Sequence, residues 1–332
     1  MTATALLLLA LAAPPSAPPG SAADERAAFD TIYVLLGQRR FSEAKAEWNR
    51  VGGRIQESLR SASGQALAPA AERALQRRVA EAWFVQGLLT ARFGEKAEAL
   101  RLLRDADGLG FPPLDSPLML LAADGLHDLQ EHALAAQAYR EILKRDPENV
   151  PARLGLGVSL YSAGQLAAAA QELEEVLRRA PATPQAHYAL GAVLFEQKRN
   201  DEAAAHLERE LALDPRCSAC LVKLAHIAYL KGDDRQCETW LAQAAALGPL
   251  SLEASLVSGM LESRAGRYDL AIRHLSRVVE ESPADTRAQY QLALAYQRGG
   301  NPEKAREHQQ IYGRLIQEQK ARSLGVRGSE EP

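Results

Sequence analysis

One pair of cysteines stands at a spacing that could do chemistry. Cys217 and Cys220 form the motif Cys217-Ser218-Ala219-Cys220, and two thiols so placed can close into a disulfide. A thiol near the start of a helix also has a lowered pKa, which favours the reactive thiolate. The sequence has no second cysteine pair to complete a zinc site and no histidine directly after Cys220 for haem attachment. We therefore favour a structural role for the pair and keep a thiol-redox or metal-dependent function as the alternative.

The other residue types that carry catalysis do not form a recognisable site. The histidines are scattered, with no H-E-x-x-H motif and no paired metal-ligand spacing. The glycines occur singly rather than in a phosphate-binding loop, and acidic residues such as Glu172 and Glu175 fit a solvated helix face. The sequence therefore predicts no enzymatic activity, no metal site and no cofactor.

A ladder of prolines organises the chain. Prolines recur every 34 residues, at Pro147, Pro181, Pro215, Pro249 and Pro283. When each proline is numbered as position 32, repeat units begin at Ser116, Val150, Pro184, Ser218, Leu252 and Thr286.

Small residues recur in the same register. Position 8 is always Ala or Gly, position 20 is Ala or, once, Cys237, and position 24 is Leu or Tyr except for Gln309 in the last unit. Small residues at two fixed points let two antiparallel helices approach closely, a large apolar residue seals the pair, and the proline stops the second helix. Each unit is thus predicted to be helix, turn, helix, with Cys237 in the core. The turn is expected at the glycines near position 15, which are Gly164, Gly232, Gly266 and Gly299.

The pattern resembles the tetratricopeptide repeat, whose signature is W-x2-L-G-x2-Y, then A-x3-F, then P, over 34 residues. The unit from Val150 carries it as Leu156-Gly157, Leu160, Ala169, Leu173 and Pro181. The resemblance implies an all-α, right-handed superhelical solenoid of stacked helix-turn-helix repeats. The departure at Gln309 implies a terminal or capping role for the last unit.

The resemblance also implies a binding groove. In this family the first helices of the repeats line a concave groove, and positions 2, 5, 9, 12 and 13 tend to face it. The expected peptide contacts at such positions are Tyr161, Tyr188, Phe195, His226, Tyr229 and Tyr290. The groove is expected to be apolar and aromatic in its middle and polar toward Arg264, Gln297 and Arg298. The alternative is that these aromatic residues belong to the core between repeats.

The start of the chain has the outline of a secretory signal peptide. An apolar run from Ala5 to Ala13 precedes a proline-rich stretch and a small-x-small cleavage site after Ala23, although Met1 to Thr4 holds no Lys or Arg. We expect export to a periplasm, with an uncleaved anchor or a misassigned start codon as alternatives. No later run reaches the roughly 20 apolar residues of a membrane span.

Both ends of the repeat array depart from the pattern. Residues 41–51 place apolar side chains at helical spacing, 61–65 is expected to be a loop, and a helix is expected from Pro69 to Arg92. A short helix through Ile316 and Lys320 is expected to cap the other end. The predicted domains are a signal peptide 1–23, a divergent helical segment 24–79, repeats 80–113, 116–149, 150–183, 184–217, 218–251, 252–285 and 286–317, and a cap and tail 318–332.

Composition agrees with a helical array that binds other proteins. The 332 residues are 47% hydrophobic but only 5% aromatic, and the formal net charge of -3 gives no general attraction to nucleic acid. The sequence predicts a non-enzymatic scaffold or adaptor that binds a partner polypeptide in the groove, with no nucleic acid and no membrane span in the mature chain. A bacterial envelope complex is expected from the family's usual occurrence and the alanine-rich composition.

Overall fold

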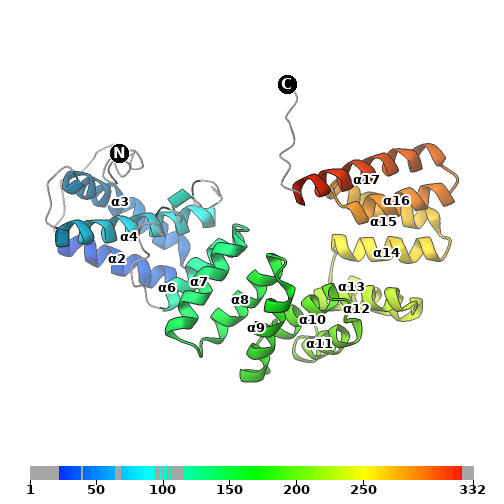
Figure 1. The fold of residues 1–332 in the computed structure, drawn as a ribbon, viewed down its shortest axis with the longest axis horizontal. Coiled ribbons are helices and arrows are strands. Elements are labelled where there is room, and N and C mark those ends of the chain that lie inside the picture. Colours follow the sequence, from blue (N-terminus) through cyan, green and yellow to red (C-terminus); the bar gives the residue numbers. More distant parts are fainter. Residues whose placement is uncertain are drawn as a thin grey trace. The chain divides into compact units, whose positions relative to one another are not determined.

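The chain is a succession of α-helices (Figure 1). The computed structural model describes residues 22–38, 40–63, 69–93 and 116–323, with Glu98, Arg101, Leu102 and Asp105 between them. Within these residues every regular element is a helix and neighbouring helices pack in pairs, which confirms the predicted all-α array. Residues 1–21 of the predicted signal peptide and most of the second helix expected in 80–113 lie outside the described residues. The chain divides into two compact units, which meet in the sequence between Ala180 and Pro181.

The first unit begins with helices that do not follow the 34-residue register. Its described helices are α2 (Ala22–Gly37), α3 (Phe41–Ser63), α4 (Pro69–Phe93), α6 (Ser116–Asp128), α7 (His132–Arg145), α8 (Val150–Ser162) and α9 (Leu166–Arg179). The prediction of a loop at 61–65 is wrong for its first three residues, because α3 continues to Ser63. Val51, Ile55 and Leu59 are buried at helical spacing, and this apolar stripe extends the helix into a polar segment.

The second unit is built from four helix pairs. They are α10 (Ala186–Glu196) with α11 (Asn200–Leu213), α12 (Ser218–Lys231) with α13 (Asp234–Leu247), α14 (Leu252–Arg264) with α15 (Tyr268–Glu281), and α16 (Thr286–Arg298) with α17 (Pro302–Ser323). Helix α17 runs unbroken through Gly313, so the helix expected through Ile316 and Lys320 continues the second helix of the last repeat. A glycine inside a helix costs about 1 kcal/mol relative to alanine. A side chain at Gly313 would meet open space, so packing does not require the glycine.

The recurring residues have the packing roles that their spacing predicted. The second helices end two residues before the prolines of position 32, as α7 does at Arg145 and α9 at Arg179, because a proline disfavours helical backbone in the residue before it. The small residue of position 8 touches the leucine of position 24. A Cβ added to Gly259 would lie 2.5 Å from Cγ of Leu275, and Leu275 is fully buried.

In the six repeats that begin at Ser116 and later, the turn falls at position 15 and its residue has left-handed backbone. The φ angles there are 66° at Gln130, 76° at Gly164, 64° at Lys198, 78° at Gly232, 77° at Gly266 and 85° at Gly300. Gly299 lies in the turn, as predicted, but it has a φ of -79°, and the left-handed residue of the last repeat is Gly300. Only glycine adopts the left-handed region without a steric penalty, so the turns at Gln130 and Lys198 carry strain.

The first helices differ in which groups accept hydrogen bonds from the backbone N–H groups at their N-termini. Side-chain oxygens cap three of them in the usual way, with Asn149 on α8, Ser251 on α14 and Asp285 on α16 each accepting a backbone N–H three residues ahead. Helix α10 begins two residues late and has no such cap. The buried carboxylate of Glu210 on α11 accepts the N–H of Gln185 at 2.8 Å and that of Tyr188 at 3.2 Å instead.

Candidate functional site

The six residues predicted to line a groove all lie on first helices of repeats. Tyr161 is on α8 in the first unit, and the other five are on α10, α12 and α16 in the second unit. Their exposure differs widely. Tyr290 is 45% exposed, whereas Phe195 and His226 are only 5% and 7% exposed. The predicted residues therefore all lie on first helices, but they do not form a uniformly exposed stripe.

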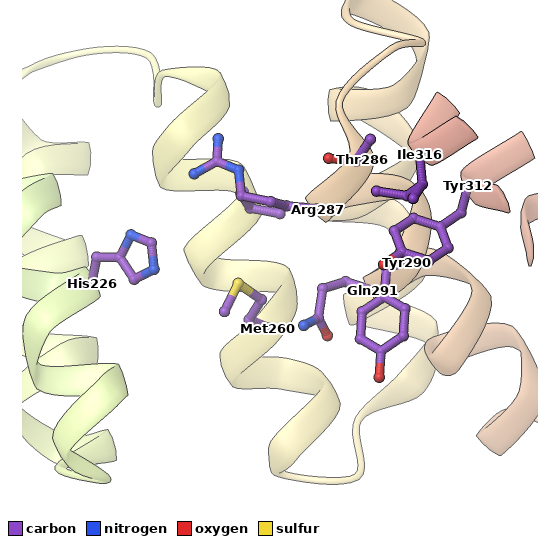
Figure 2. A pocket seen from close by; sticks show the side chains of 9 residues that line it. His226, Met260, Thr286, Arg287, Tyr290, Gln291, Tyr312 and Ile316 are labelled. Atoms are coloured by element: carbon purple, nitrogen blue, oxygen red, sulfur yellow. The ribbon is translucent and has the colours of Figure 1, made fainter. Parts of the chain in front are cut away.

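A cavity of about 250 Å³ opens among the helices of the second unit. It is lined by side chains from α12, α14, α16 and α17 (Figure 2), namely His226, Leu256, Met260, Thr286, Arg287, Tyr290, Gln291, Tyr312 and Ile316. Two of the predicted groove residues, His226 and Tyr290, are among them. Small-molecule sites usually occupy about 300–1,000 Å³, so this smaller cavity suits a single side chain of a partner.

A fixed network of charges borders the cavity. Nδ1 of His226 lies 3.0 Å from Oε1 of Glu253, and because a carboxylate only accepts hydrogen bonds, Nδ1 carries the proton. Nη2 of Arg287 lies 3.1 Å from Oε2 of Glu253. The hydrogen bond from His226 outweighs the burial of Glu253 and, with the charge of Arg287, lowers the pKa of Glu253 to about 2.

The guanidinium of Arg287 is also shared. Besides Glu253, it pairs with Asp285 at 3.2 Å. Its pKa is raised, because the two carboxylates outweigh the burial that opposes its charge. Arg287 therefore brings hydrogen-bond donors to the cavity, while its charge is already balanced within the chain.

The opposite side of the cavity is apolar and aromatic. The rings of Tyr290 on α16 and Tyr312 on α17 lie with their centroids 5.4 Å apart, and Ile316 follows Tyr312 one helical turn later. Met260 on α14 stands between His226 and the tyrosines (Figure 2). Aromatic rings and a flexible thioether form a surface that accommodates apolar side chains of various shapes.

Two of the other predicted groove residues are covered by side chains of their own chain. The ring of Phe195 packs on that of His226 with centroids 5.0 Å apart, and Nζ of Lys223 lies 4.9 Å from its centre. The guanidinium of Arg264 lies 3.6 Å above the ring of Tyr229 and donates to its carbonyl oxygen. These contacts stabilise the packing between repeats.

Tyr188 and Tyr161 are half-buried on their first helices. Burial is the main cause that raises the pKa of the Tyr188 hydroxyl. Whether any of the six residues binds a peptide stays a prediction.

Several residues around the cavity were not singled out from the sequence. Glu253 and Arg287 stand at position 2 of consecutive units, a position expected to face the groove, so their spacing of 34 residues was the available signal. They place a charged network in the last two units, toward which the groove was expected to turn polar at other residues. Tyr312 and Ile316 stand on the second helix of the last unit, whereas the groove was expected from first helices alone.

The cysteines occupy two different environments. Cys217 and Cys220 are joined by a disulfide with their Cα atoms 5.3 Å apart, a separation that such a bond requires. Cys237 is free and buried, as its position in the repeat predicted, and burial raises the pKa of its thiol to about 11.

The described residues include neither a metal-binding cluster nor a membrane-spanning helix. Within that part of the chain, no group of three or more His, Cys, Asp and Glu side chains is arranged to hold a metal ion. Among the same residues, no helix has the length and apolar character needed to cross a membrane.

Comparison with known proteins identifies the repeats. Models of the tetratricopeptide repeat match residues 120–182, 156–216 and 264–308. A tetratricopeptide repeat protein from Parabacteroides merdae has a similar solved structure, with a TM-score of 0.55 and 15% identity over 78% of this chain and 99% of that chain. A chain of the APC/C hetero-tetramer Cut9-Hcn1 matches with a TM-score of 0.59 and 18% identity over 93% of this chain and 59% of that one. No curated protein matches the sequence.

At these identities the solved structures show the fold alone. The repeat models match residues 120–216 and 264–308, which lie within the longer stretch where the prolines and left-handed turns recur. Tetratricopeptide repeats are in general modules of protein interaction rather than enzymes, and the fold supports a role as a protein-interaction scaffold. Residues 120–216 and 264–308 of this chain are tetratricopeptide repeats.

Proposed function

We propose that the protein is a non-enzymatic scaffold that binds a segment of a partner polypeptide in the cavity formed by α12, α14, α16 and α17. The observation that carries this proposal is the cavity itself, with Met260, Tyr290 and Tyr312 on its apolar side and Arg287 and Gln291 at its polar edge. Buried aromatic anchors supply most of the affinity in protein interfaces. A partner would insert one apolar side chain here.

The polar edge favours recognition of the partner's backbone. Arg287 and Gln291 supply N–H donors, which suit the carbonyl oxygens of an extended or helical segment. Because the charge of Arg287 is already balanced by Glu253 and Asp285, a carboxylate on the partner would gain little. Binding is therefore expected to depend only weakly on ionic strength.

A peptide selection tests this proposal. Peptides are selected from a random library on the immobilised protein, and the dissociation constant of a selected peptide is measured by titration calorimetry with the wild type and with Tyr290→Ala. Loss of an aromatic anchor costs about 2 kcal/mol, so the variant should bind roughly 30-fold more weakly.

Leu213→Ala is the matched control. Leu213 is 50% exposed at the end of α11 and does not line the cavity, so its loss should change the dissociation constant by less than about twofold. Peptides that bind Tyr290→Ala as tightly as the wild type would exclude the cavity as the binding site. A loss of affinity in Tyr161→Ala instead would assign binding to the first unit.

We also propose that the protein is exported and acts in a bacterial envelope complex. The support is the apolar run, the proline-rich stretch and the small residues before Asp24. Expression of the full chain with a carboxy-terminal tag in a bacterium, followed by fractionation and amino-terminal sequencing, is the test. A periplasmic product that begins at Asp24 is expected, and a cytoplasmic product that retains Met1 would contradict export.

A further inference from the structure

The two linked cysteines differ sharply in accessibility. Cys220 is fully buried, whereas Cys217 is partly exposed in the connection between α11 and α12. Cys217 is the N-cap residue of α12, and its Sγ lies 3.2 Å from the backbone N–H of Cys220, which points at the sulfur. An external reagent therefore has better access to Cys217 than to Cys220.

The disulfide contributes little as a structural link. It joins residues three apart at the start of a single helix, and the stabilisation from a disulfide grows with the length of the loop it closes. Its position links no two helices. Helix α12 is already held by buried Leu221, Leu224 and Ala225, so the fold does not require the bond.

The start of α12 favours the reduced form of Cys217. The positive end of a helix and its unpaired N–H groups stabilise a thiolate, and here the N–H of Cys220 is already directed at Sγ of Cys217. Stabilising the thiolate lowers the free energy of the reduced pair relative to the disulfide. Such a disulfide is easily reduced, while the burial of Cys220 protects the second thiol from other reactions.

We propose that Cys217 and Cys220 form a redox-active site that exchanges electrons with the dithiol of a thiol–disulfide oxidoreductase. A thiolate of that dithiol attacks Sγ of Cys217, the Cys217–Cys220 bond breaks, and Cys220 leaves as a thiolate that takes up a proton. The second thiolate of the dithiol then attacks the oxidoreductase sulfur that is bonded to Cys217, which releases Cys217 as a thiolate that takes up the second proton. The pair gains two electrons and two protons, and the partner dithiol becomes a disulfide. This site acts independently of peptide binding in the cavity.

The chain offers a clean background for testing this site. Cys237 is the remaining cysteine, and alanine occupies its position in the other five repeats, at Ala135, Ala169, Ala203, Ala271 and Ala305. Cys237→Ala should therefore fold normally and leave only the pair to react. All thiol measurements are made on this background with the full chain.

The first measurement is reduction of the native disulfide by dithiothreitol at neutral pH, followed by thiol counting and far-ultraviolet circular dichroism. Two thiols per chain are expected to appear while helicity and the midpoint of thermal unfolding stay unchanged. Reduction that proceeds only in denaturant, or that melts the helices, would overturn the proposal, because the bond would then be a structural link.

The second measurement identifies the attacked sulfur with two single variants. Cys220→Ala keeps the accessible thiol of Cys217 and fills a buried site with a small residue, while Cys217→Ser keeps a side-chain cap on α12. With oxidised glutathione, Cys220→Ala should form a mixed disulfide at least about tenfold faster than Cys217→Ser, because only the exposed, helix-capping thiol is reactive. Equal rates, or no reaction of either folded variant, would overturn the assignment.

Discussion

Tyr139 requires a glycine at position 155 of the next repeat, because its ring occupies the space that a side chain there would need. Four other repeats have leucine at its position, whereas the buried Tyr139 hydroxyl donates to Oδ1 of Asp124 at 2.6 Å. Burial and that hydrogen bond raise the pKa of the hydroxyl far above its usual value. Space for the ring comes from Gly155 on the next repeat, where an added Cβ would lie 2.3 Å from Cζ of Tyr139.

The contact predicts a coupled pair of substitutions. Gly155→Ala should lower the free energy of unfolding by about 1–3 kcal/mol, because the tyrosine ring must move in a packed core. In a Tyr139→Leu background the same change should cost less than about 1 kcal/mol, since leucine leaves room for the methyl group. Urea unfolding of the four proteins measures the coupling, and additive effects would show that the ring and Gly155 do not compete for space.

Glu253 predicts a pH-dependent contribution to stability. Its pKa of about 2 in the folded chain lies below the ordinary value near 4.3. A lowered carboxylate pKa stabilises the fold fully above about pH 4.3, and the stabilisation is lost as the pH falls toward 2. Glu253→Gln should thus be less stable than the wild type by about 1–2 kcal/mol at neutral pH.

That difference should shrink once the pH falls below the ordinary carboxyl value. Urea unfolding of the wild type and Glu253→Gln between about pH 7 and pH 3 follows it directly. A difference that stays constant over this range would mean that the charge of Glu253 is not what stabilises the network with His226 and Arg287.

At the scale of the helix pair, the repeats differ in the residue that they place at the left-handed turn. Four repeats use glycine at position 15, but Gln130 and Lys198 hold the same conformation with side chains. Lys198→Gly should raise the free energy of unfolding by about 0.5–1 kcal/mol, because the steric cost of left-handed backbone exceeds the entropy that glycine adds to the unfolded chain.

The matching control reverses the change. Gly232→Ala, at the same position of the next repeat, should lower the free energy of unfolding by about 1 kcal/mol, although a side chain there meets no other atom. Thermal and urea unfolding of both variants checks the pair. A Lys198→Gly protein that is less stable than the wild type would contradict the argument from backbone strain.

The helix pairs could be predicted from the sequence, whereas the cavity could be predicted only in part. Prolines, small residues and leucines at fixed positions are local signals that mark where each helix ends and which face it buries. His226 and Tyr290 were found because they follow that register. Tyr312 was missed because it stands on a second helix, whereas the groove was expected from first helices, and its role depends on α17 packing beside α16. The cover of Arg264 over Tyr229 depends on a rotamer, which residue spacing does not encode.

At the scale of the whole molecule, its histidines predict sensitivity to mild acid. Burial is the first cause that lowers the pKa of four of them, His127, His187, His206 and His308. Nδ1 of His187 lies 2.9 Å from Nδ1 of His206, so one of these two nitrogens donates a hydrogen bond and the other accepts it. A second proton would place two N–H groups against each other.

The sign of this effect follows from the lowered pKa values. The unfolded chain takes up protons near the ordinary histidine pKa of about 6.5, before the folded chain does, so stability is complete above that pH and falls below it. The midpoint of thermal unfolding should therefore drop between about pH 7 and pH 5. His206→Asn should reduce the drop, and an identical pH profile for this variant would exclude the His187–His206 pair as a cause.

The close contact between Gly155 and the ring of Tyr139 limits how the repeats of this protein can be rearranged. The residues at the same position of the later repeats are Ala189, Lys223, Val257 and Gln291, and each carries the Cβ that Tyr139 excludes. A chain in which repeat 116–149 is joined directly to any later repeat would place a side chain against that ring. Duplication or deletion of repeats, by recombination or by design, must therefore leave this one junction intact. The contact between Tyr139 and Gly155 requires repeat 150–183 to follow repeat 116–149.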